Sequence, residues 1–436
     1  MMKSFRLNSR VDTLVSSKLG NNEEGEISNR DNRFNANMML IFMVVLFGGF
    51  IWLMLKYGWT GRGVAASVHG HEIDWLLNLN FIIIVAVFFI TNALLFLFAF
   101  KYVKKPGVKA FYFPHNNKLE MLWTVVPACV LAVIIILGLK SWNQVTDQAV
   151  PESIRVELFS KQFDWTARYS GADNTLGKFD YKLTTDNNEL AILTSATLDS
   201  AIYQMEFGAM GINALESKLN DSKLMMIPED REKMMADLGR KEMLVRLLYQ
   251  MKGRHDSKLD AQAWDDIIQK DTLYLCKGQE YEIALRAKDV IHSAYFPHFR
   301  AQMNCVPGMV TQFGFTPTIT TTEMRLNPDM IDKVANINKI RAENSEAIEA
   351  KGQELRYEFD YLLICNKICG KSHYNMQMKI IVETQEEFDA WLKEQKTFKN
   401  SLISIIQNIP VSIFLAFIFC ILFLIFLKLL LSILKF

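Results

Sequence analysis

The sequence predicts a membrane protein whose α-helical anchors carry an external all-β domain with two helical insertions. Three observations lead to this fold class. Four apolar blocks without a charged side chain interrupt an otherwise polar chain. Between the third and fourth block, some stretches alternate apolar and polar residues, as half-buried strands do. Two other stretches in the same region repeat apolar residues at helical spacing.

Each apolar block is close to the length of about 20 residues that a membrane-spanning helix needs. The blocks cover residues 38–55, 75–100, 121–139 and 409–427. A helix buried in a soluble domain has a polar stripe, whereas these blocks are apolar on every face. The first block follows a tail of mixed charge, residues 1–37, and no clear cleavage site follows it. We therefore expect an uncleaved anchor there and not a signal peptide.

The charges of the loops predict the orientation in the membrane. The loop 101–119 carries five lysines and no acidic residue, whereas the loop 57–74 has Arg62 against two acidic residues. Short lysine-rich loops stay in the cytoplasm. The tail 1–37 is therefore expected in the cytoplasm, and the long region 140–400 is expected outside.

The external region is expected to be a small β-sandwich or barrel. Alternating residues predict strands near glycine-containing turns, and Met-, Leu- and charge-rich residues at helical spacing predict insertions between them. The strand-like stretches are 156–169, 271–289 and 357–364, and the helical insertions are about 196–270 and 328–355.

The balance of charge excludes a nucleic-acid partner bound through bulk positive charge, because 48 basic residues face 47 acidic ones. The six cysteines do not form a disulfide framework. Cys129 and Cys420 lie in apolar blocks, where a cysteine is usually a small hydrophobic residue. Cys276 and Cys305 bracket a strand pair, and both a disulfide and two free buried thiols are compatible with their positions. No Cys-x-x-Cys-His occurs, so no covalently attached c-type haem is expected.

Two cysteines, a histidine and a methionine lie in one loop after a predicted strand. The segment YLLICNKICGKSHYNM contains Cys365, Cys369, His373 and Met376. Thiolates, imidazoles and thioethers are soft ligands, which suit copper and disfavour magnesium or calcium. Methionine is not a usual zinc ligand, and a structural zinc site more often has a second Cys or His pair. The loop therefore predicts a copper site. A site for two metals needs one more imidazole than this loop supplies.

His292 is the candidate for this imidazole. It lies in DVIHSAYFPHFR, at the end of a predicted strand and well before Cys365. In cupredoxins, one histidine ligand comes from the end of an early strand, and the further ligands come from a single late loop. Four other histidines are expected to be ordinary core or surface residues: His69, His71, His255 and His298.

Three separated segments resemble cytochrome c oxidase subunit II of bacterial haem-copper oxidases. HNNKLEMLWTVVP, residues 115–127, resembles the start of the second helix of that family's membrane hairpin. KQFDWTARYSG, residues 161–171, resembles its aromatic segment, and DVIHS with CNKICGKSHYNM resembles its binuclear copper loop. The residues 306–308, Val-Pro-Gly, fit the same pattern. The first apolar block, both insertions and the last block lie outside the resemblance.

The resemblance implies a cupredoxin-like Greek-key domain with two copper ions. The implied ligands are His292, Cys365, Cys369, His373, Met376 and the main-chain carbonyl of Lys367. Two thiolates that each bridge both metals share one electron, so each copper changes little on reduction. Lys367 replaces a glutamate that helps the family to hold magnesium at the interface with the catalytic subunit, which puts a magnesium ion there in doubt.

The resemblance also implies roles outside the metal loop. Phe163 stands where the family has a tryptophan that receives electrons, and Trp165 follows two residues later, so this segment is the expected region of electron entry. Asn304 stands where an aspartate is usual, which weakens the acidic docking surface. Glu120 corresponds to a glutamate at the entrance of a proton channel, although a carboxylate at a helix start is also stabilised by the helix dipole alone.

The implied function is the electron-entry subunit of a terminal respiratory oxidase, a proton-translocating oxidoreductase in the bacterial inner membrane. Its copper domain would face the periplasm and receive electrons from cytochrome c or a cytochrome-carrying donor complex. The haem-containing catalytic subunit I would reduce oxygen to water, and the insertions suggest further membrane subunits. The alternative is a stand-alone membrane-anchored copper carrier or chaperone, which needs neither the 115–127 segment nor Glu120. A quinol-oxidase subunit would lack the copper ligands.

Overall fold

The computed structural model describes residues 29–58, 62–103, 108–109, 111–147, 150–185, 187–221, 224–350, 352 and 354–407. The chain divides into two compact units. One contains most of the long N-terminal helices, and the other contains Gly63–Asp74 and the chain from Gly138 onward. Most of the predicted N-terminal tail and the predicted span 409–427 lie outside the described residues.

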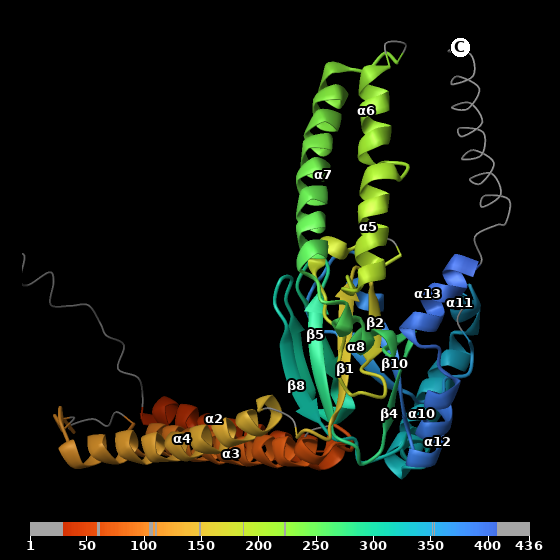
Figure 1. Ribbon diagram of the computed structural model, residues 1–436. Helices are drawn as coiled ribbons and strands as arrows, with labels where there is room; N and C mark the ends of the chain where they lie inside the picture. Colours follow the sequence, from red (N-terminus) through yellow and green to blue (C-terminus); the bar gives the residue numbers. More distant parts are fainter. Residues whose placement is uncertain are drawn as a thin grey trace, which may run out of the picture. The chain divides into compact units, whose positions relative to one another are not determined.

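Three long helices, α2 (Asn29–Tyr57), α3 (Val68–Lys101) and α4 (Asn117–Thr146), contain the first three predicted spans (Figure 1). Among the described residues, these three are long and apolar enough to cross a membrane. Large apolar side chains on them are exposed, as Ile84 and Ile136 illustrate, which suits contact with lipid chains. The protein is therefore anchored in a membrane by its N-terminal helices.

The β-domain that follows the long helices is a sandwich of two five-stranded sheets. The strands are β1 (Ile154–Lys161), β2 (Asp164–Tyr169), β3 (Ile267–Lys270), β4 (Thr272–Cys276), β5 (Tyr281–Ala287), β6 (His292–Phe296), β7 (Ala301–Cys305), β8 (Thr311–Phe315), β9 (Tyr361–Cys365) and β10 (Gln377–Glu383). Their order is β3-β2-β1-β5-β8 in one sheet and β4-β10-β9-β6-β7 in the other. The predicted class of membrane helices and a β-domain with helical insertions is confirmed.

Alternation along the strands places one face of each sheet in a common core. Tyr281, Ile283 and Leu285 of β5 are buried, and the residues between them are less so. Tyr361 and Leu363 repeat the pattern in β9, and the core draws residues from both sheets. Period-two burial of this kind is what the sequence pattern predicts for strands with one face turned to the core.

Two strand boundaries differ from the sequence prediction. The stretch 156–169 is not one strand but the β1–β2 hairpin, which turns at Gln162 and Phe163. Residues Ile267–Lys270, expected at the end of the first insertion, form β3 and pair with β2. The strand is only four residues long, so the helical composition of the preceding chain hides it.

The first insertion lies between β2 and β3 and is mostly helical. Its helices are α5 (Ser195–Phe207), α6 (Ile212–Asn220), α7 (Pro228–Arg254) and α8 (Ala261–Trp264). Figure 1 shows that α5 and α6 run beside α7 and project beyond the strands. Leu198, Ile202 and Leu248 belong to a small core of their own between these helices. The insertion is therefore a separately packed hairpin attached to the edge of the sandwich.

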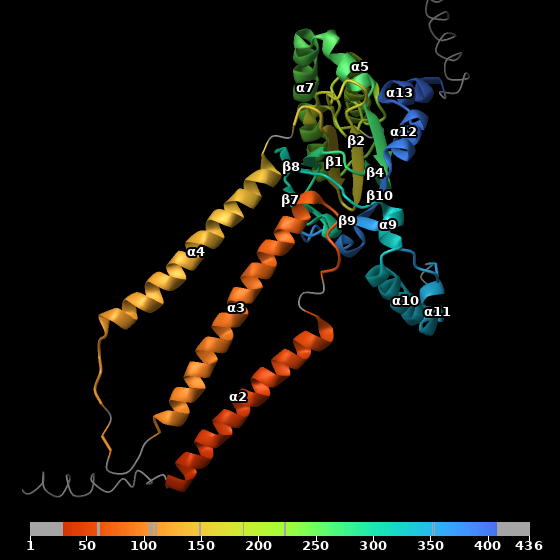
Figure 2. The same cartoon turned by 90° about the horizontal axis from the view of Figure 1, so that it is seen from below.

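The remaining helices follow β8. The second insertion contains α9 (Thr321–Arg325), α10 (Pro328–Glu343) and α11 (Ser345–Glu349). After β10 come α12 (Gln385–Glu394) and α13 (Phe398–Gln407). Helix α12 lies beside β4 and β10 (Figure 2). Its Trp391 stacks on Tyr274. Helices α9 and α12 therefore contact the sheet that contains β6 and β9.

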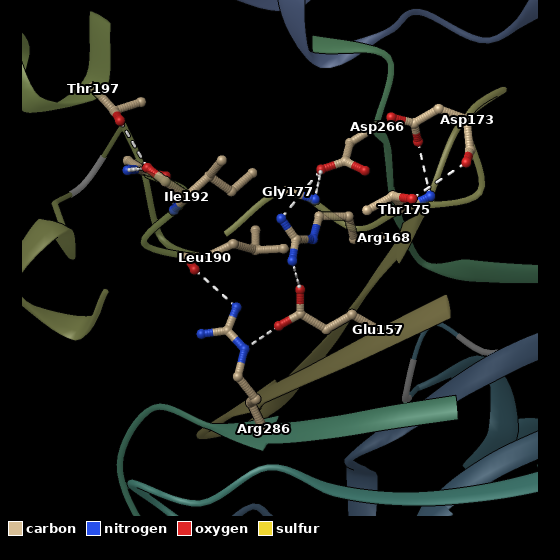
Figure 3. A network of polar contacts seen from close by, with 11 residues as sticks. Glu157, Arg168, Asp173, Thr175, Gly177, Leu190, Ile192, Thr197, Asp266 and Arg286 are labelled. Carbon is tan, nitrogen blue, oxygen red and sulfur yellow. Dashed lines mark hydrogen bonds and ion pairs between the residues drawn. The ribbon is translucent and has the colours of Figure 1, made fainter. Parts of the chain in front are cut away.

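A buried network of charges lies on the outer face of the first sheet (Figure 3). Arg168 of β2 forms ion pairs with Glu157 of β1 and, at 3.2 Å, with Asp266 just before β3. Arg286 of β5 pairs with the same Glu157 and donates a hydrogen bond to the Leu190 carbonyl at 2.8 Å. No side chain of these four ionisable residues is more than 9% exposed. The network therefore fixes the segment that leads from β2 into the first insertion.

The two acids of the network differ in their proton affinity. Burial raises the pKa of Asp266 to about 7, although Arg168 acts in the opposite direction. Burial would also raise the pKa of Glu157, but Arg168 and Arg286 together hold it below its usual value. An acid whose pKa is raised on folding binds its proton more tightly in the folded state. The contribution of Asp266 to stability therefore falls as the pH rises from about 4 to about 7, whereas Glu157 contributes most above its unfolded pKa.

Candidate metal centre

Two neighbouring strands and one loop bring the predicted ligands together. Strands β6 and β9 are antiparallel with Ala294 opposite Cys365, so His292 at the start of β6 lies beside the end of β9. The loop that follows closes on itself, because the Cys365 amide donates to the Met376 carbonyl at 3.0 Å. The Asn366 amide donates to the Ser293 carbonyl of β6 at the same distance. Backbone hydrogen bonds thus fix both ends of the loop to the sheet.

Four predicted donor groups surround the two cysteine sulfurs. Cys365 Sγ lies 3.9 Å from Cys369 Sγ, 3.9 Å from His292 Nδ1 and 3.2 Å from the Lys367 carbonyl oxygen. Cys369 Sγ lies 3.6 Å from His373 Nδ1 and 3.7 Å from Met376 Sδ. His292, Cys365 and Cys369 offer ligand atoms that all lie within 4.8 Å of one another. This cluster can hold a metal.

The cluster is shielded from water. Cys365 and Cys369 are 8% and 4% exposed, and His292 and Met376 are buried more completely. Burial, with a smaller effect of the neighbouring Cys365, raises the pKa of the Cys369 thiol to about 11. Thiolates are the metal-binding form of cysteine, so metal uptake releases protons from this site. The donors are sulfur and nitrogen with one carbonyl oxygen, which fits a soft transition metal and not a hard cation.

Asp289 is a supporting residue that the sequence prediction did not include among the site residues. Its Oδ1 lies 2.8 Å from His292 Nε2, so the other ring nitrogen, Nδ1, is directed at the sulfurs. The carboxylate also accepts hydrogen bonds from the amides of Gln162 and Val290, each at 2.7 Å. A carboxylate that receives the outer N–H of a ligating histidine fixes the tautomer and the ring orientation. The sequence feature that could have indicated Asp289 is its position three residues before His292.

The two aromatic residues predicted for electron entry occupy different positions. Trp165 is fully buried, and its ring centroid lies 6.3 Å from that of His292, so it packs behind the cluster. Phe163 lies at the tip of the β1–β2 hairpin against Gly370 of the metal loop. Gly370 has a φ of +141°, a backbone conformation that favours glycine, and an added Cβ would lie 2.8 Å from Gln162 Nε2 and 3.0 Å from the Phe163 ring. Gln162 next to it donates a hydrogen bond to the Cys369 carbonyl.

Glu120, Cys276 and Cys305 are not among the clustered donor groups, although Cys305 lies opposite His292 in the β6–β7 pair. Glu120 is in the first turn of α4, where its Oε1 accepts a hydrogen bond from the Asn116 amide at 3.2 Å. Cys276 and Cys305 are free thiols. They belong to β4 and β7, the two opposite edges of one sheet. Four strand spacings, about 19 Å in all, separate those edges, and a disulfide needs Cα atoms within about 7 Å.

Comparison with known proteins gives a consistent set of relatives. Residues 59–141 match the family model "Cytochrome C oxidase subunit II, transmembrane domain". The chain is 26% identical over 363 residues to the alternative cytochrome c oxidase subunit 2 of Bradyrhizobium diazoefficiens, covering 82% of this chain and 92% of that protein. It is 21% identical over 360 residues to cytochrome c oxidase subunit 2 of Cereibacter sphaeroides, covering 82% and 86%.

Among solved structures, the periplasmic domain of subunit II of cytochrome oxidase (CoxB) of Bradyrhizobium japonicum is similar at 13% identity and a TM-score of 0.24. That similarity covers 56% of this chain and 95% of the other. The family match lies in the membrane helices, and the sequence similarity extends across the domain that contains the metal cluster. The chain is therefore similar to cytochrome c oxidase subunit 2 proteins over most of its length.

Proposed function

We propose that this chain is the electron-entry subunit of a terminal respiratory oxidase. The observation that carries the proposal is the clustering of both cysteines with His292, His373 and Met376 at one end of a membrane-anchored β-sandwich. The chain would receive electrons from cytochrome c or a cytochrome-carrying donor complex. It would pass them to the haem of the catalytic subunit I, where oxygen is reduced to water. The names of its relatives support this assignment.

The donor set fits a dinuclear copper centre. The two cysteine sulfurs lie 3.9 Å apart and would both hold the metal, and the other donors divide into two groups around them. His292 and the Lys367 carbonyl lie by Cys365, whereas His373 and Met376 lie by Cys369. Bound copper would supply a couple that accepts and releases one electron at a time. The exposed Lys367 offers no carboxylate, so its side chain does not support a magnesium site.

The residues of this chain keep the ligands in place during such a reaction. Asp289 orients His292, and the hydrogen bond from Gln162 holds the Cys369 carbonyl. Trp165 excludes water behind the site. Ligands held by an outer shell of this kind need little reorganisation when the charge of the site changes.

The placement in the cell follows from the same proposal. The apolar helices α2, α3 and α4 would lie in the bacterial inner membrane, and the sandwich would lie on its periplasmic side. The lysine-rich loop 101–119 would then face the cytoplasm. The predicted C-terminal span, 409–427, would add a fourth crossing.

Affinity purification of the tagged full chain from membranes tests the proposal. We expect a haem-containing membrane protein to co-purify and elemental analysis to give two copper ions per chain. A stand-alone carrier or chaperone would also contain copper but would bring no haem protein with it. One zinc ion and no copper per chain would contradict the metal assignment.

Lys367→Ala removes the side-chain amine of this residue and keeps its main-chain carbonyl. The proposed ligand is the carbonyl oxygen, 3.2 Å from Cys365 Sγ, and the side chain is exposed. We therefore expect the copper content and the visible spectrum to stay nearly unchanged in this variant. Loss of copper would show that the side chain, and not the carbonyl, serves the site. Lys371→Ala, in the same loop but without a proposed ligand atom, is the matched control.

Glu120→Gln tests the proposed entrance for protons. The amide keeps the shape and a hydrogen-bond acceptor for the Asn116 amide but cannot titrate. We expect oxygen consumption by the assembled oxidase to fall severalfold while reduction of copper by the donor stays fast. If the carboxylate only stabilises the start of α4, the change costs about 0.3 to 1 kcal/mol of stability and turnover is unaltered. Glu72→Gln, near the start of α3, is the control.

A further inference from the structure

Residues 63–74, which lie between α2 and the main part of α3, are built into the β-domain. Ala65, Ala66 and Ser67 are buried, and Ala66 belongs to the hydrophobic core that the two sheets share. These residues fall into the same compact unit as the domain, whereas α3 from Trp75 onward belongs to the other unit. We name residues 63–74 the strap.

The strap is hydrogen-bonded to two segments of the domain. The Ala66 amide donates to the His298 carbonyl at 2.7 Å, in the turn between β6 and β7. The Ala66 carbonyl accepts a hydrogen bond from the Thr318 amide at 2.9 Å, just after β8. Ser67 adds a side-chain hydrogen bond to the Phe299 carbonyl at 2.6 Å. The strap therefore joins the β6–β7 turn to the end of β8.

Arg300 connects both ends of the strap to the same turn. Its Nε and Nη2 atoms donate to the two Asp74 carboxylate oxygens at 2.9 and 3.0 Å. Nη2 also donates to the Gly63 carbonyl at 2.9 Å, and Nη1 donates to the Pro297 carbonyl at 2.6 Å. The side chains of Arg300 and Asp74 are only 9% and 21% exposed. A forked contact between arginine and a carboxylate is among the strongest and most directional of polar contacts.

The backbone of Arg300 adopts the left-handed conformation, with a φ of +55°. This conformation is uncommon for a residue other than glycine and persists where the surrounding contacts hold it. Arg300 lies at one end of the β6–β7 hairpin, and His292, a proposed copper ligand, lies at the other end. The strap thus holds the hairpin that supplies this ligand, at the end remote from the metal cluster.

We infer that Arg300 and Asp74 are positioning residues for electron transfer out of the proposed copper centre, because through the strap they hold the β-domain to the start of α3. The inference rests on the proposed electron-entry function. Units joined by a few chain crossings move relative to each other unless an interface holds them. Transfer of one electron from copper to the haem of the catalytic subunit slows steeply as their separation grows. A domain released from the strap would therefore deliver electrons more slowly.

Asp74→Asn in the purified full oxidase assembly tests the inference. The amide keeps the shape of the side chain but removes the charge that Arg300 binds. The fully reduced assembly with carbon monoxide on the haem is mixed with oxygen, and a light flash releases the carbon monoxide. The absorbance of the copper centre then reports the departure of its electron, with no cytochrome donor present. We expect this step to slow by about tenfold, since a misplacement of about 1 Å can cost about 100-fold in rate.

Hydrogen exchange gives a readout that does not depend on electron transfer. The amides of Ala66 and Thr318 are hydrogen-bonded in the strap pairing, so local opening of the strap limits their exchange. We expect both to exchange faster in Asp74→Asn. Copper content and the visible spectrum should stay unchanged, because the metal ligands lie at the other end of the hairpin. Asp74→Glu keeps the charge and should keep most of the electron-transfer rate.

Asp237→Asn is the matched control. Asp237 pairs with Lys241 at 3.1 Å on α7 of the first insertion, and their side chains are 31% and 20% exposed. This variant should leave both the electron-transfer rate and the exchange of the strap amides unchanged.

Three outcomes would overturn the inference while leaving the electron-entry function in place. The first is an Asp74→Asn assembly with an unchanged rate from copper to haem, whether or not the strap amides exchange faster. The second is equal slowing in Asp237→Asn. The third is loss of copper from Asp74→Asn, because the strap would then serve the ligands and not the position of the domain. If the copper of the unchanged protein passes no electron to the haem at all, the proposed electron-entry function itself fails.

Discussion

Cys365→Ser is expected to abolish the metal centre and with it the transfer of electrons from any cytochrome. Cys365 Sγ is the atom around which His292, Cys369 and the Lys367 carbonyl gather. A serine hydroxyl is a poor ligand for a soft metal and does not bridge two metals as a thiolate does. Loss of an outer-shell partner alone typically costs about 10- to 100-fold in affinity or activity. Loss of this bridging ligand should exceed that range in oxygen uptake by the assembled enzyme.

The matched control for Cys365→Ser is Cys276→Ser. Cys276 is buried in the same sheet, on the edge strand β4 two strands away from β9, and its thiol lies 3.2 Å from Gln385 Oε1. We expect this variant to retain both copper ions and normal turnover. The measurements are elemental analysis, the visible spectrum and oxygen uptake of each purified assembly. A Cys365→Ser protein with a full complement of copper would refute the assignment of the ligand.

Arg168→Ala is expected to produce the largest loss of stability among single substitutions in the external domain. The side chain is 1% exposed and pairs with Glu157 and Asp266, which are 2% and 0% exposed. Removing it leaves a buried carboxylate without its partner and opens a cavity. Breaking a buried ion pair in this way typically costs about 3 to 5 kcal/mol. For a domain of this size, the melting temperature should fall by about 6 to 20 °C.

Arg155→Ala is the comparison for that loss. Arg155 lies on the same strand, β1, and pairs with Glu282 at 3.3 Å, but its side chain is 45% exposed. An exposed ion pair contributes about 0 to 1 kcal/mol, so this variant should melt close to the unchanged protein. Thermal denaturation of the three purified proteins, followed by circular dichroism at one scan rate, measures both effects. Equal melting temperatures for the two variants would show that the buried network does not stabilise the fold.

The spacing of ligands explains why the cluster could be predicted from the sequence. Cys365, Cys369, His373 and Met376 lie in one short loop, so their proximity follows from chain connectivity. His292 reaches this loop only through the fold of the domain, and the cupredoxin order of ligands predicted that fold. The register of β6 and β9 places it where the order requires. Short loops and regular strands are the parts of a structure in which sequence distance constrains spatial distance most closely.

The buried network could not be predicted in the same way. Glu157, Arg168, Asp266 and Arg286 are far apart in sequence, and charged residues on a strand normally indicate a face turned to water. They are buried because the segment before the first insertion covers that face, as the hydrogen bond from Arg286 to the Leu190 carbonyl shows. The burial of the Trp165 side chain was difficult to predict for a related reason, since an aromatic residue near a surface loop can point to either side of the sheet. Contacts of this type depend on tertiary packing and leave no local pattern.

The pairing of Tyr169 with Ile267 has a consequence for how this domain tolerates changes in length. The chain leaves the sheet at Tyr169 and returns beside it at Ile267, so a longer connection between β2 and β3 would not have to bridge a greater distance. Loop closure becomes only about 0.6 kcal/mol less favourable for each doubling of a loop's length. The turn between α6 and α7, at the far end of the hairpin, is therefore a suitable place to splice in a fluorescent or affinity-tag domain. Such a fusion would leave the strands that carry the metal ligands as they are.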